Sequence, residues 1–307
     1  MSIRIGLGIA GFPYSSPQAF LRWIDQCEDS EIDSIWVSDR LVSSTPVLEP
    51  LAAFGMIAGR TKRLKFGMNA IVLPFRDPLV LAKECATLDF LSDGRLLPAF
   101  GVGAETSPEF RTTGRKAAGR GAQSDEMLTL LARLWSEDHV SFEGKHYRYV
   151  DVTITPKPKQ SPLPIWIGGS SDAAIRRTAL LGTGWLAGLQ SPAQVAPVVK
   201  AIRAASAEAG RPIDPDHYGA GFSYRFGSWD EPIVERSAAG YARLGAGVDP
   251  KAVFAVGGAE EIIAKAKEYI DAGISKFVLR PLTSTDEEMT GQTQRLIEEV
   301  LPVVHAL

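Results

Sequence analysis

Residues 65–105 read KFGMNAIVLPFRDPLVLAKECATLDFLSDGRLLPAFGVGAE. This stretch contains an apolar run (residues 64–73), a segment with helical periodicity (78–91) and a second apolar run (96–102). The order strand, helix, strand has the length that a crossover between parallel strands requires. Near-continuous apolar strands are typical of a sheet that is buried on both faces. The stretch therefore predicts a parallel α/β fold, in which ligands bind at the carboxyl ends of the strands.

The same alternation of strand and helix continues on both sides of this stretch. Further strands are predicted at residues 3–9, 33–37, 163–167, 184–187, 219–226 and 276–279, and further helices at 48–58, 122–135, 191–209, 231–244, 259–272 and 286–305. We expect residues 106–120 to form a loop. Residues 140–158 alternate like strands around Glu143-Gly144-Lys145, a hairpin signal. Eight strands, no internal repeat and no low-complexity linker predict one domain over residues 1–307.

Bulk properties narrow the function classes. A chain of 307 residues suits one α/β barrel, for which about 250 residues is typical. The net charge is −3 without a block of like charges, which argues against a nucleic-acid-binding face. We expect neither a signal peptide nor a membrane span. Cys27 and Cys85 lie in predicted helices and are expected to be buried thiols of a cytoplasmic protein.

Residues 65–105 also carry a family resemblance. Arg76-Asp77-Pro78, the run over residues 81–95 and Gly101-Val102-Gly103 together resemble the luciferase-like oxidoreductases, which use flavin or deazaflavin. Shorter matching pieces recur between Trp36 and Trp185, so the likeness is strongest over the first two thirds of the chain. The resemblance implies a luciferase-like (β/α)8 TIM barrel, with the hairpin inserted after the fourth βα unit. It also implies an enzyme that uses reduced FMN or coenzyme F420.

The clearest ligand signal is the run Gly168, Gly169, Ser170 and Ser171, which leads directly into a helix from Asp172. Small residues let a phosphate approach the backbone, and a helix N-terminus offers free N–H groups and the positive end of a dipole. The alternative is a plain strand-to-helix turn with a serine cap. With the resemblance, we expect a cofactor phosphate here. Gly103, at the end of an earlier strand, is expected to contact the same cofactor.

The resemblance assigns the cofactor ring to Asn69, Ala70 and Ile71. Members of the family carry a non-proline cis peptide in this strand, which supports the ring in a bent shape. By this likeness we expect the cis bond between Ala70 and Ile71. The alternative is an ordinary trans strand in the core.

The polar candidates for catalysis follow other strands: they are Asp39, Arg40 and Glu105. In F420-dependent relatives a histidine occupies the position of Arg40, which follows Asp39. An arginine cannot act as a general base, but it stabilises an anionic flavin, a peroxide or a carboxylate substrate. The alternative for Arg40 is a structural clamp with Asp39 or Glu49. Glu105 matches a proton donor of some relatives, and its alternative is a loop acid paired with a nearby arginine such as Arg120.

Phe12, Trp185, Tyr224 and Arg280 are expected to line the substrate pocket. Aromatic core packing and an ion pair are the alternatives for these residues. The histidines lie away from the predicted strand ends, and no metal-ligand spacing, P-loop or nucleophile elbow occurs in the sequence. We therefore expect no metal and a redox cofactor that carries the chemistry.

The cofactor assignment stays open in the sequence. Several FMN monooxygenases carry a histidine and a tyrosine where this chain has residues 117–121, AAGRG. Our first hypothesis is a monooxygenase that uses reduced FMN and O2 on a small organic substrate, with a separate flavin reductase and a homodimeric assembly. The alternatives are F420-dependent hydride transfer, a non-catalytic flavin-binding protein, and a barrel enzyme that acts on a phosphorylated metabolite.

Overall fold

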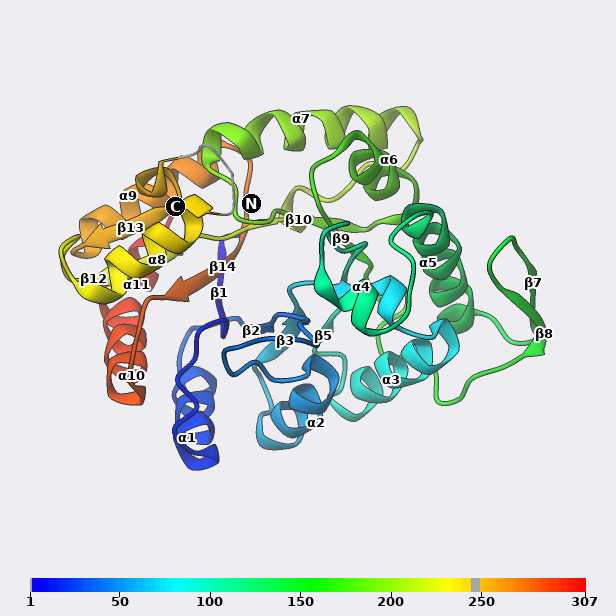
Figure 1. Ribbon diagram of the computed structural model, residues 1–307, viewed down its shortest axis with the longest axis horizontal. Helices are drawn as coiled ribbons and strands as arrows, with labels where there is room; N and C mark the ends of the chain where they lie inside the picture. Colours follow the sequence, from blue (N-terminus) through cyan, green and yellow to red (C-terminus); the bar gives the residue numbers. More distant parts are fainter. Residues whose placement is uncertain (1, 244–248) are drawn as a thin grey trace.

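A closed ring of parallel strands forms the centre of the computed structural model, which describes residues 2–243 and 249–307 (Figure 1). Within these residues the ring has eight positions, three of which are split into two short strands. In order they are β1 (Arg4–Gly8), β2 (Ser34–Val37), β3 with β4 (Lys65–Met68, Ile71–Val72), β5 with β6 (Leu96–Leu97, Ala99–Gly101), β9 (Trp166–Gly168), β10 (Gly184–Leu186), β11 with β12 (Tyr218–Ala220, Ser223–Phe226) and β14 (Lys276–Pro281). Parallel pairing of β14 with β1 closes the ring, which confirms the predicted barrel.

Helices surround the strands (Figure 1). They are α1 (Pro17–Glu28), α2 (Pro50–Arg60), α3 (Pro78–Leu91), α5 (Arg120–Ser136), α6 (Asp172–Leu181), α7 (Pro192–Glu208), α8 (Pro232–Arg243), α9 (Ala259–Asp271) and α10 (Asp286–Arg295), the last continued by a π-helical turn (Leu296–Val300) and α11 (Leu301–Val304). Several of them begin with proline. Proline fits the first helical position because its φ is already helical and its missing N–H has no partner there.

Four details differ from the sequence-based expectation. The third and fourth strands were expected to be continuous, but they break at Asn69-Ala70 and at Pro98, which has no N–H for the ladder. The loop at residues 106–120 contains a short helix, α4 (Pro108–Thr112). A further strand, β13 (Phe254–Gly257), pairs with β12 and is too short to show a period in the sequence. The predicted helix 231–244 ends at a residue outside the described ranges.

The predicted hairpin is confirmed. Strands β7 (Val140–Glu143) and β8 (Arg148–Val152) pair antiparallel and project away from the barrel (Figure 1). Glu126 of α5 anchors the turn, because its carboxylate accepts the backbone N–H groups of Lys145 at 2.9 Å and His146 at 2.8 Å. These hydrogen bonds therefore attach the hairpin turn to α5, the helix that precedes it.

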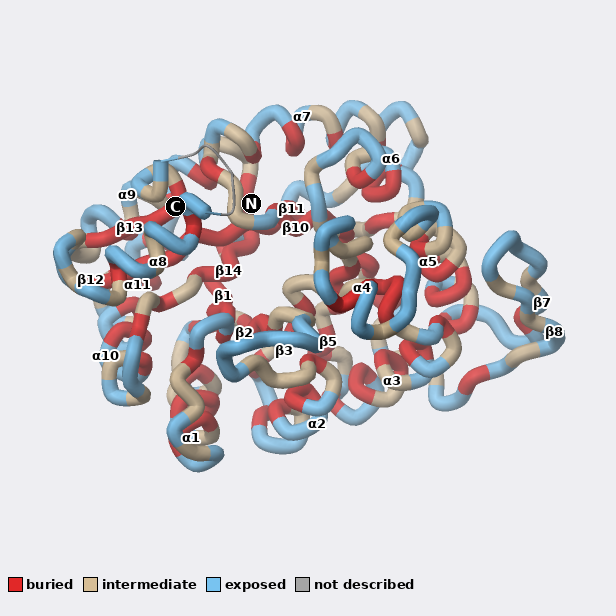
Figure 2. The backbone as a smooth tube through the Cα atoms, viewed as in Figure 1, coloured by how far each residue is buried: buried red, intermediate tan, exposed pale blue. Residues whose placement is uncertain are grey.

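The core lies between the strands and the inner faces of the helices, where Figure 2 shows the buried positions. Trp23, Trp36 and Tyr269 are among its largest fully buried side chains, and Cys27 and Cys85 are buried thiols, as predicted. No helix in the described ranges combines the length and the apolar character needed to cross a membrane.

Glu28, the last residue of α1, ties this helix to β3. Its carboxylate accepts the N–H groups of Lys62 at 2.7 Å, Arg63 at 2.9 Å and Leu64 at 2.8 Å. Burial alone would raise the pKa of Glu28, but these donors lower it below its usual range. A depressed carboxyl pKa contributes stability above the unfolded value of about 4.3, and the contribution is lost as the pH falls through the folded pKa.

Replacement of Glu28 by glutamine is expected to lower the free energy of unfolding by about 1–2 kcal/mol at pH 7, because one oxygen and the charge are lost. The difference from the native protein should shrink as the pH falls below about 4.3. Urea titrations at several pH values measure both effects. Glu235→Gln, at an exposed position of α8, is the matched control. An equal loss in both variants would contradict this role for Glu28.

Candidate active site at the carboxyl end of the barrel

Small residues on neighbouring strands form a floor at the carboxyl end of the barrel. A Cβ atom built on Gly168 would lie 3.6 Å from the Cβ of Ala70, and one built on Gly101 would lie 3.8 Å from it. All three residues are partly accessible. This floor of Ala70, Gly101 and Gly168 therefore has no side chain larger than a methyl group, so a flat ring can rest on the backbone.

The cis peptide lies beside this floor, between Asn69 and Ala70. The resemblance had placed it one residue later, between Ala70 and Ile71, and that position is wrong. The N–H of Asn69 still bonds to the carbonyl of Val37 at 2.8 Å, and Ile71 already pairs with β6. The break in the ladder therefore falls between Asn69 and Ile71.

The turn from β9 into α6 adjoins the floor and contains the predicted phosphate site. Gly169 has φ +107°, a conformation that favours glycine. Ser171 caps α6 by accepting the N–H of Ala174 at 3.3 Å, and the Ser170 hydroxyl donates to the side chain of Gln190. The first N–H groups of α6 have no partner within the helix. They point toward this turn, as an anion site requires.

Gly103 extends the same surface along the fourth strand position. Its φ is +72°, and a Cβ there would lie 2.9 Å from Cγ1 of Val72. Its carbonyl accepts the Nε–H of Arg120 at 3.2 Å. Only glycine fits this position, so its identity follows from the backbone as well as from any ligand.

Three aromatic residues expected in the substrate pocket lie in the core instead. Trp185 is 0% exposed, and its indole N–H donates to the carbonyl of Gly169 at 2.7 Å, which holds the phosphate turn. Tyr224 is fully buried and reaches the backbone of Gln292 in α10, outside the ring. Phe12 packs against residues of α1. Because all three side chains are buried in these contacts, we assign them to core packing rather than to substrate contact.

Arg40 and Arg280 line one cavity of about 200 Å³ at the carboxyl ends of β1, β2 and β14. The stem of Arg280 lies over Gly8, where a Cβ would be 3.1 Å from its Cγ. Its Nε is enclosed and has no hydrogen-bond partner among the described residues, and burial lowers the pKa of Arg280. Neither guanidinium forms an ion pair with any carboxylate in residues 2–243 or 249–307. An arginine stays protonated even so, and the cavity is therefore positively charged.

Asp39 does not face this cavity as a free acid. Its side chain is 1% exposed and accepts the N–H of Val72 at 3.0 Å and the guanidinium of Arg76 at 2.7 Å. Arg76 also contacts Glu49 at 3.1 Å. The clamp considered for Arg40 is thus made by Arg76. Burial raises the pKa of Asp39, against the opposing effect of Arg76.

Asp39→Asn is expected to lower the free energy of unfolding by about 2–3 kcal/mol, because Arg76 loses its buried charge partner. Thermal and urea unfolding measure this loss. Asp29→Asn, at the exposed end of α1, is the control and should change stability by less than about 0.5 kcal/mol. A normally stable Asp39→Asn protein would show that the clamp is dispensable.

Glu109, which the sequence analysis did not single out, is the enclosed acid of this segment, whereas the predicted Glu105 is exposed. The side chain of Glu105 is 74% exposed and lies 3.5 Å from Arg120, one of the partners considered for it. Glu109, in the first turn of α4, is 6% exposed and accepts the hydroxyl of Ser107. That hydrogen bond, with smaller contributions from Val42 and Arg40, lowers the pKa of Glu109. The Ser-Pro-Glu start of a helix was the available signal.

The histidines of the chain lie elsewhere. His139 and His146 belong to the hairpin region, and His217 bonds to the carbonyl of Thr183 beside the start of β11. No group of three potential metal ligands occurs in the described part of the chain. The mouth of the barrel therefore offers guanidinium groups, backbone N–H groups and hydroxyls.

Comparison with known proteins identifies the family to which this chain belongs. Residues 4–252 match the sequence profile of the family described as luciferase-like monooxygenases. The chain belongs to this family. Its members are oxidoreductases, so the enzyme class predicted from residues 65–105 is confirmed.

Individual relatives of this luciferase-like chain include F420-dependent dehydrogenases and a monooxygenase. It is 26% identical to an F420-dependent glucose-6-phosphate dehydrogenase of Amycolatopsis mediterranei, over 95% of this chain and 96% of that protein. Among solved structures, monooxygenase RslO1 from Streptomyces bottropensis has a TM-score of 0.84 at 22% identity, covering 98% and 99% of the two chains. An F420-dependent secondary alcohol dehydrogenase has a TM-score of 0.83 at 20% identity, covering 99% of each chain. At these identities the two structures support the fold alone.

Proposed function

We propose that this luciferase-like protein binds reduced FMN at the carboxyl end of its barrel and oxygenates a small organic substrate with O2. One observation carries the proposal: the floor of Ala70, Gly101 and Gly168 continues directly into the turn of Gly169, Ser170 and Ser171. A flat ring fits the floor and a phosphate fits the turn. Gly168 of the floor directly precedes the turn, so a single cofactor can occupy both.

The residues present fit such a group. Side chains at Gly168 or Gly101 would fill the floor, and the N–H groups of α6 with the Ser170 and Ser171 hydroxyls would hold the phosphate. When bound, reduced FMN supplies two electrons and the reaction with oxygen. The chain's own part is to orient the ring, to exclude water and to place the substrate beside it.

The acids near the mouth favour oxygenation over removal of a hydride from an alcohol. Removal of a hydride from an alcohol needs a base that accepts the hydroxyl proton. The oxygens of Asp39 are already engaged, Glu109 accepts the Ser107 hydroxyl, and the side chain of Glu105 is 74% exposed. The choice of FMN over F420 therefore depends on the lack, among the described residues of the mouth, of a free base for this proton. A separate flavin reductase would supply the reduced cofactor.

Coenzyme F420 is the second candidate. The full-length similarity to an F420-dependent glucose-6-phosphate dehydrogenase favours it. A deazaflavin ring would use the same floor and its phosphate the same turn. The protein would then transfer a hydride instead of activating oxygen.

Anaerobic titration with FMNH2 and, separately, with F420 tests the proposal. Saturable binding of FMNH2 together with substrate-dependent oxygen consumption supports oxygenation. Binding of F420 alone supports hydride transfer, with glucose 6-phosphate and secondary alcohols as the first substrates. Binding of FMNH2 without turnover of any substrate in a broad screen would favour a non-catalytic flavin-binding protein. Binding of neither cofactor would refute the site.

A further inference from the structure

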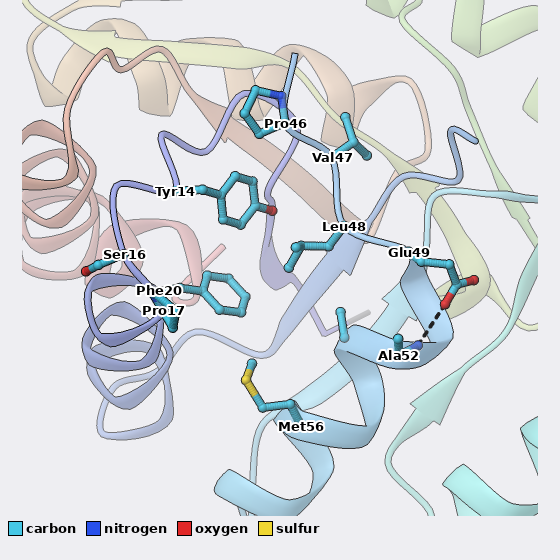
Figure 3. Close-up of a pocket in the computed structure, with 11 residues that line it drawn as sticks. Tyr14, Ser16, Pro17, Phe20, Pro46, Val47, Leu48, Glu49, Ala52 and Met56 are labelled. Atoms are coloured by element: carbon cyan, nitrogen blue, oxygen red, sulfur yellow. Dashed lines mark hydrogen bonds between the residues drawn. The ribbon is translucent and has the colours of Figure 1, made fainter. Parts of the chain in front are cut away.

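An apolar pocket of about 490 Å³ lies between the connection that follows β1 and helix α2 (Figure 3). Figure 3 shows the side chains of Tyr14, Phe20, Leu48 and Met56 around it. Its lining is mostly carbon: Glu49 is its one charged residue, and its carboxylate is turned to the N–H of Ala52 at 2.8 Å. Apolar surface of this kind favours an apolar occupant.

This pocket adjoins the positively charged cavity of Arg40 and Arg280. The two spaces share Tyr14, Val47 and Leu48 as walls. Tyr14 has φ +52°, an uncommon conformation for a residue with a side chain, and its enclosed hydroxyl has no partner in the described ranges. Strained residues and unpaired buried polar groups concentrate at ligand sites. The two spaces therefore adjoin at these residues, one lined by guanidinium groups and the other by apolar side chains.

We propose that the substrate is a carboxylate with an apolar tail, its head bound by Arg280 with Arg40 and its tail in the pocket of Figure 3. This assignment rests on the proposed function, since it names the substrate class of the same site. The floor of Ala70, Gly101 and Gly168 lies on the third to fifth strand positions, whereas the charged cavity lies on β14, β1 and β2. A head held there faces the cofactor floor across the barrel mouth.

The charges support an anionic head. Arg280 is partly buried, and its enclosed Nε lacks a hydrogen-bond partner within the described residues. A bound carboxylate would pair its charge and form two parallel hydrogen bonds with it. Within residues 2–243 and 249–307 no carboxylate forms an ion pair with Arg280. This geometry indicates that a bound ligand is the missing charge partner of Arg280.

The neighbouring pocket supports an apolar tail. A sugar hydroxyl placed among Phe20, Leu48 and Met56 would lose its hydrogen bonds to water. An alkyl or aryl group would gain from burial there. The substrate therefore differs from glucose 6-phosphate, which is uniformly polar.

Calorimetric titration of the full chain with octanoate and with octanamide tests the head. Octanoate should bind at least about 10-fold more tightly, since charged hydrogen bonds are worth about 1.5–3 kcal/mol. Arg280→Met should abolish most of that preference, and Arg22→Met, at an exposed site on α1, should leave it unchanged. Equal affinities for octanoate and octanamide, or tighter binding of glucose 6-phosphate, would overturn the proposal.

A pocket-filling substitution tests the tail. Ala52 is exposed on α2 and lines the pocket, so Ala52→Phe should fold normally and weaken octanoate binding about 10-fold or more. Ala204→Phe, at an exposed position of α7 away from the pocket, is the matched control. Equal octanoate affinity in both variants would overturn the assignment of the tail.

These measurements need no cofactor, so a failed cofactor titration would not decide them. Conversely, Ala52→Phe should bind FMNH2 or F420 as the native protein does, because the pocket lies away from the floor and the phosphate turn. Failure of the substrate assignment and failure of the proposed function are therefore distinguishable.

Discussion

Ser170→Glu is expected to weaken binding of FMNH2, or of F420, by about 30-fold or more. The new carboxylate would lie in the turn where the phosphate is expected, and like charges about 7 Å apart at an effective dielectric constant near 20 repel by about 2 kcal/mol. The substitution also removes the hydroxyl that donates to Gln190. Anaerobic titration followed by absorbance or fluorescence measures the change.

Two controls separate charge from structure. Ser170→Ala removes the same hydrogen bond without adding charge and should cost less than about 10-fold in affinity. Ala204→Glu adds the same charge on an exposed face of α7 and should have no effect. Unchanged cofactor affinity in Ser170→Glu would place the phosphate somewhere other than this turn, whatever else the barrel binds.

Arg95→Ala is expected to lower the free energy of unfolding by about 4 kcal/mol, the largest stability loss predicted for this chain. The guanidinium is buried and donates five hydrogen bonds. They reach the carbonyls of Ala58, Thr61, Leu64 and Ser92 and the hydroxyl of Thr61, at 2.6–2.9 Å. These groups lie at the ends of α2 and α3 and just before β3, so removal of the guanidinium leaves buried carbonyls without partners.

Lysine should not rescue this position, because its three donors cannot reproduce the planar fork of arginine. We expect Arg95→Lys to remain at least about 2 kcal/mol less stable than the native protein. Arg236→Ala, at an exposed site on α8, is the control and should change stability by less than about 0.5 kcal/mol. Urea unfolding gives all three values. A loss below about 1 kcal/mol for Arg95→Ala would show that water replaces the guanidinium.

The residues that revealed the family are mostly structural. Asp89, which is 0% exposed, accepts both the backbone N–H and the side-chain amide of Gln160, and Arg95 ties two helix ends to the sheet. Gly94 has φ +84°, which suits glycine in the turn between α3 and β5. The run over residues 81–95 thus identifies the barrel because several of its residues stabilise that fold. It says little about the reaction.

The sequence by itself determined the barrel, the hairpin and the strand-to-helix turn at residues 168–171. Each of these depends on local chemistry: the periodicity of apolar residues, proline at helix starts, and small residues before a helix. The glycine and serine positions at 168–171 could be found because a strand end followed by a helix has one geometry.

Only the tertiary structure decided which side chains face the mouth. Strand residues alternate between faces, and a short strand does not reveal which face is inside. For that reason Trp185 and Tyr224 could be taken for pocket residues, although they pack in the core. Arg76, distant in the sequence, neutralises Asp39, while Arg40 and Arg280 line one cavity and form no ion pair with a carboxylate of the described residues. Which distant charges pair depends on where the closed ring places each strand end. No local sequence pattern predicts that placement.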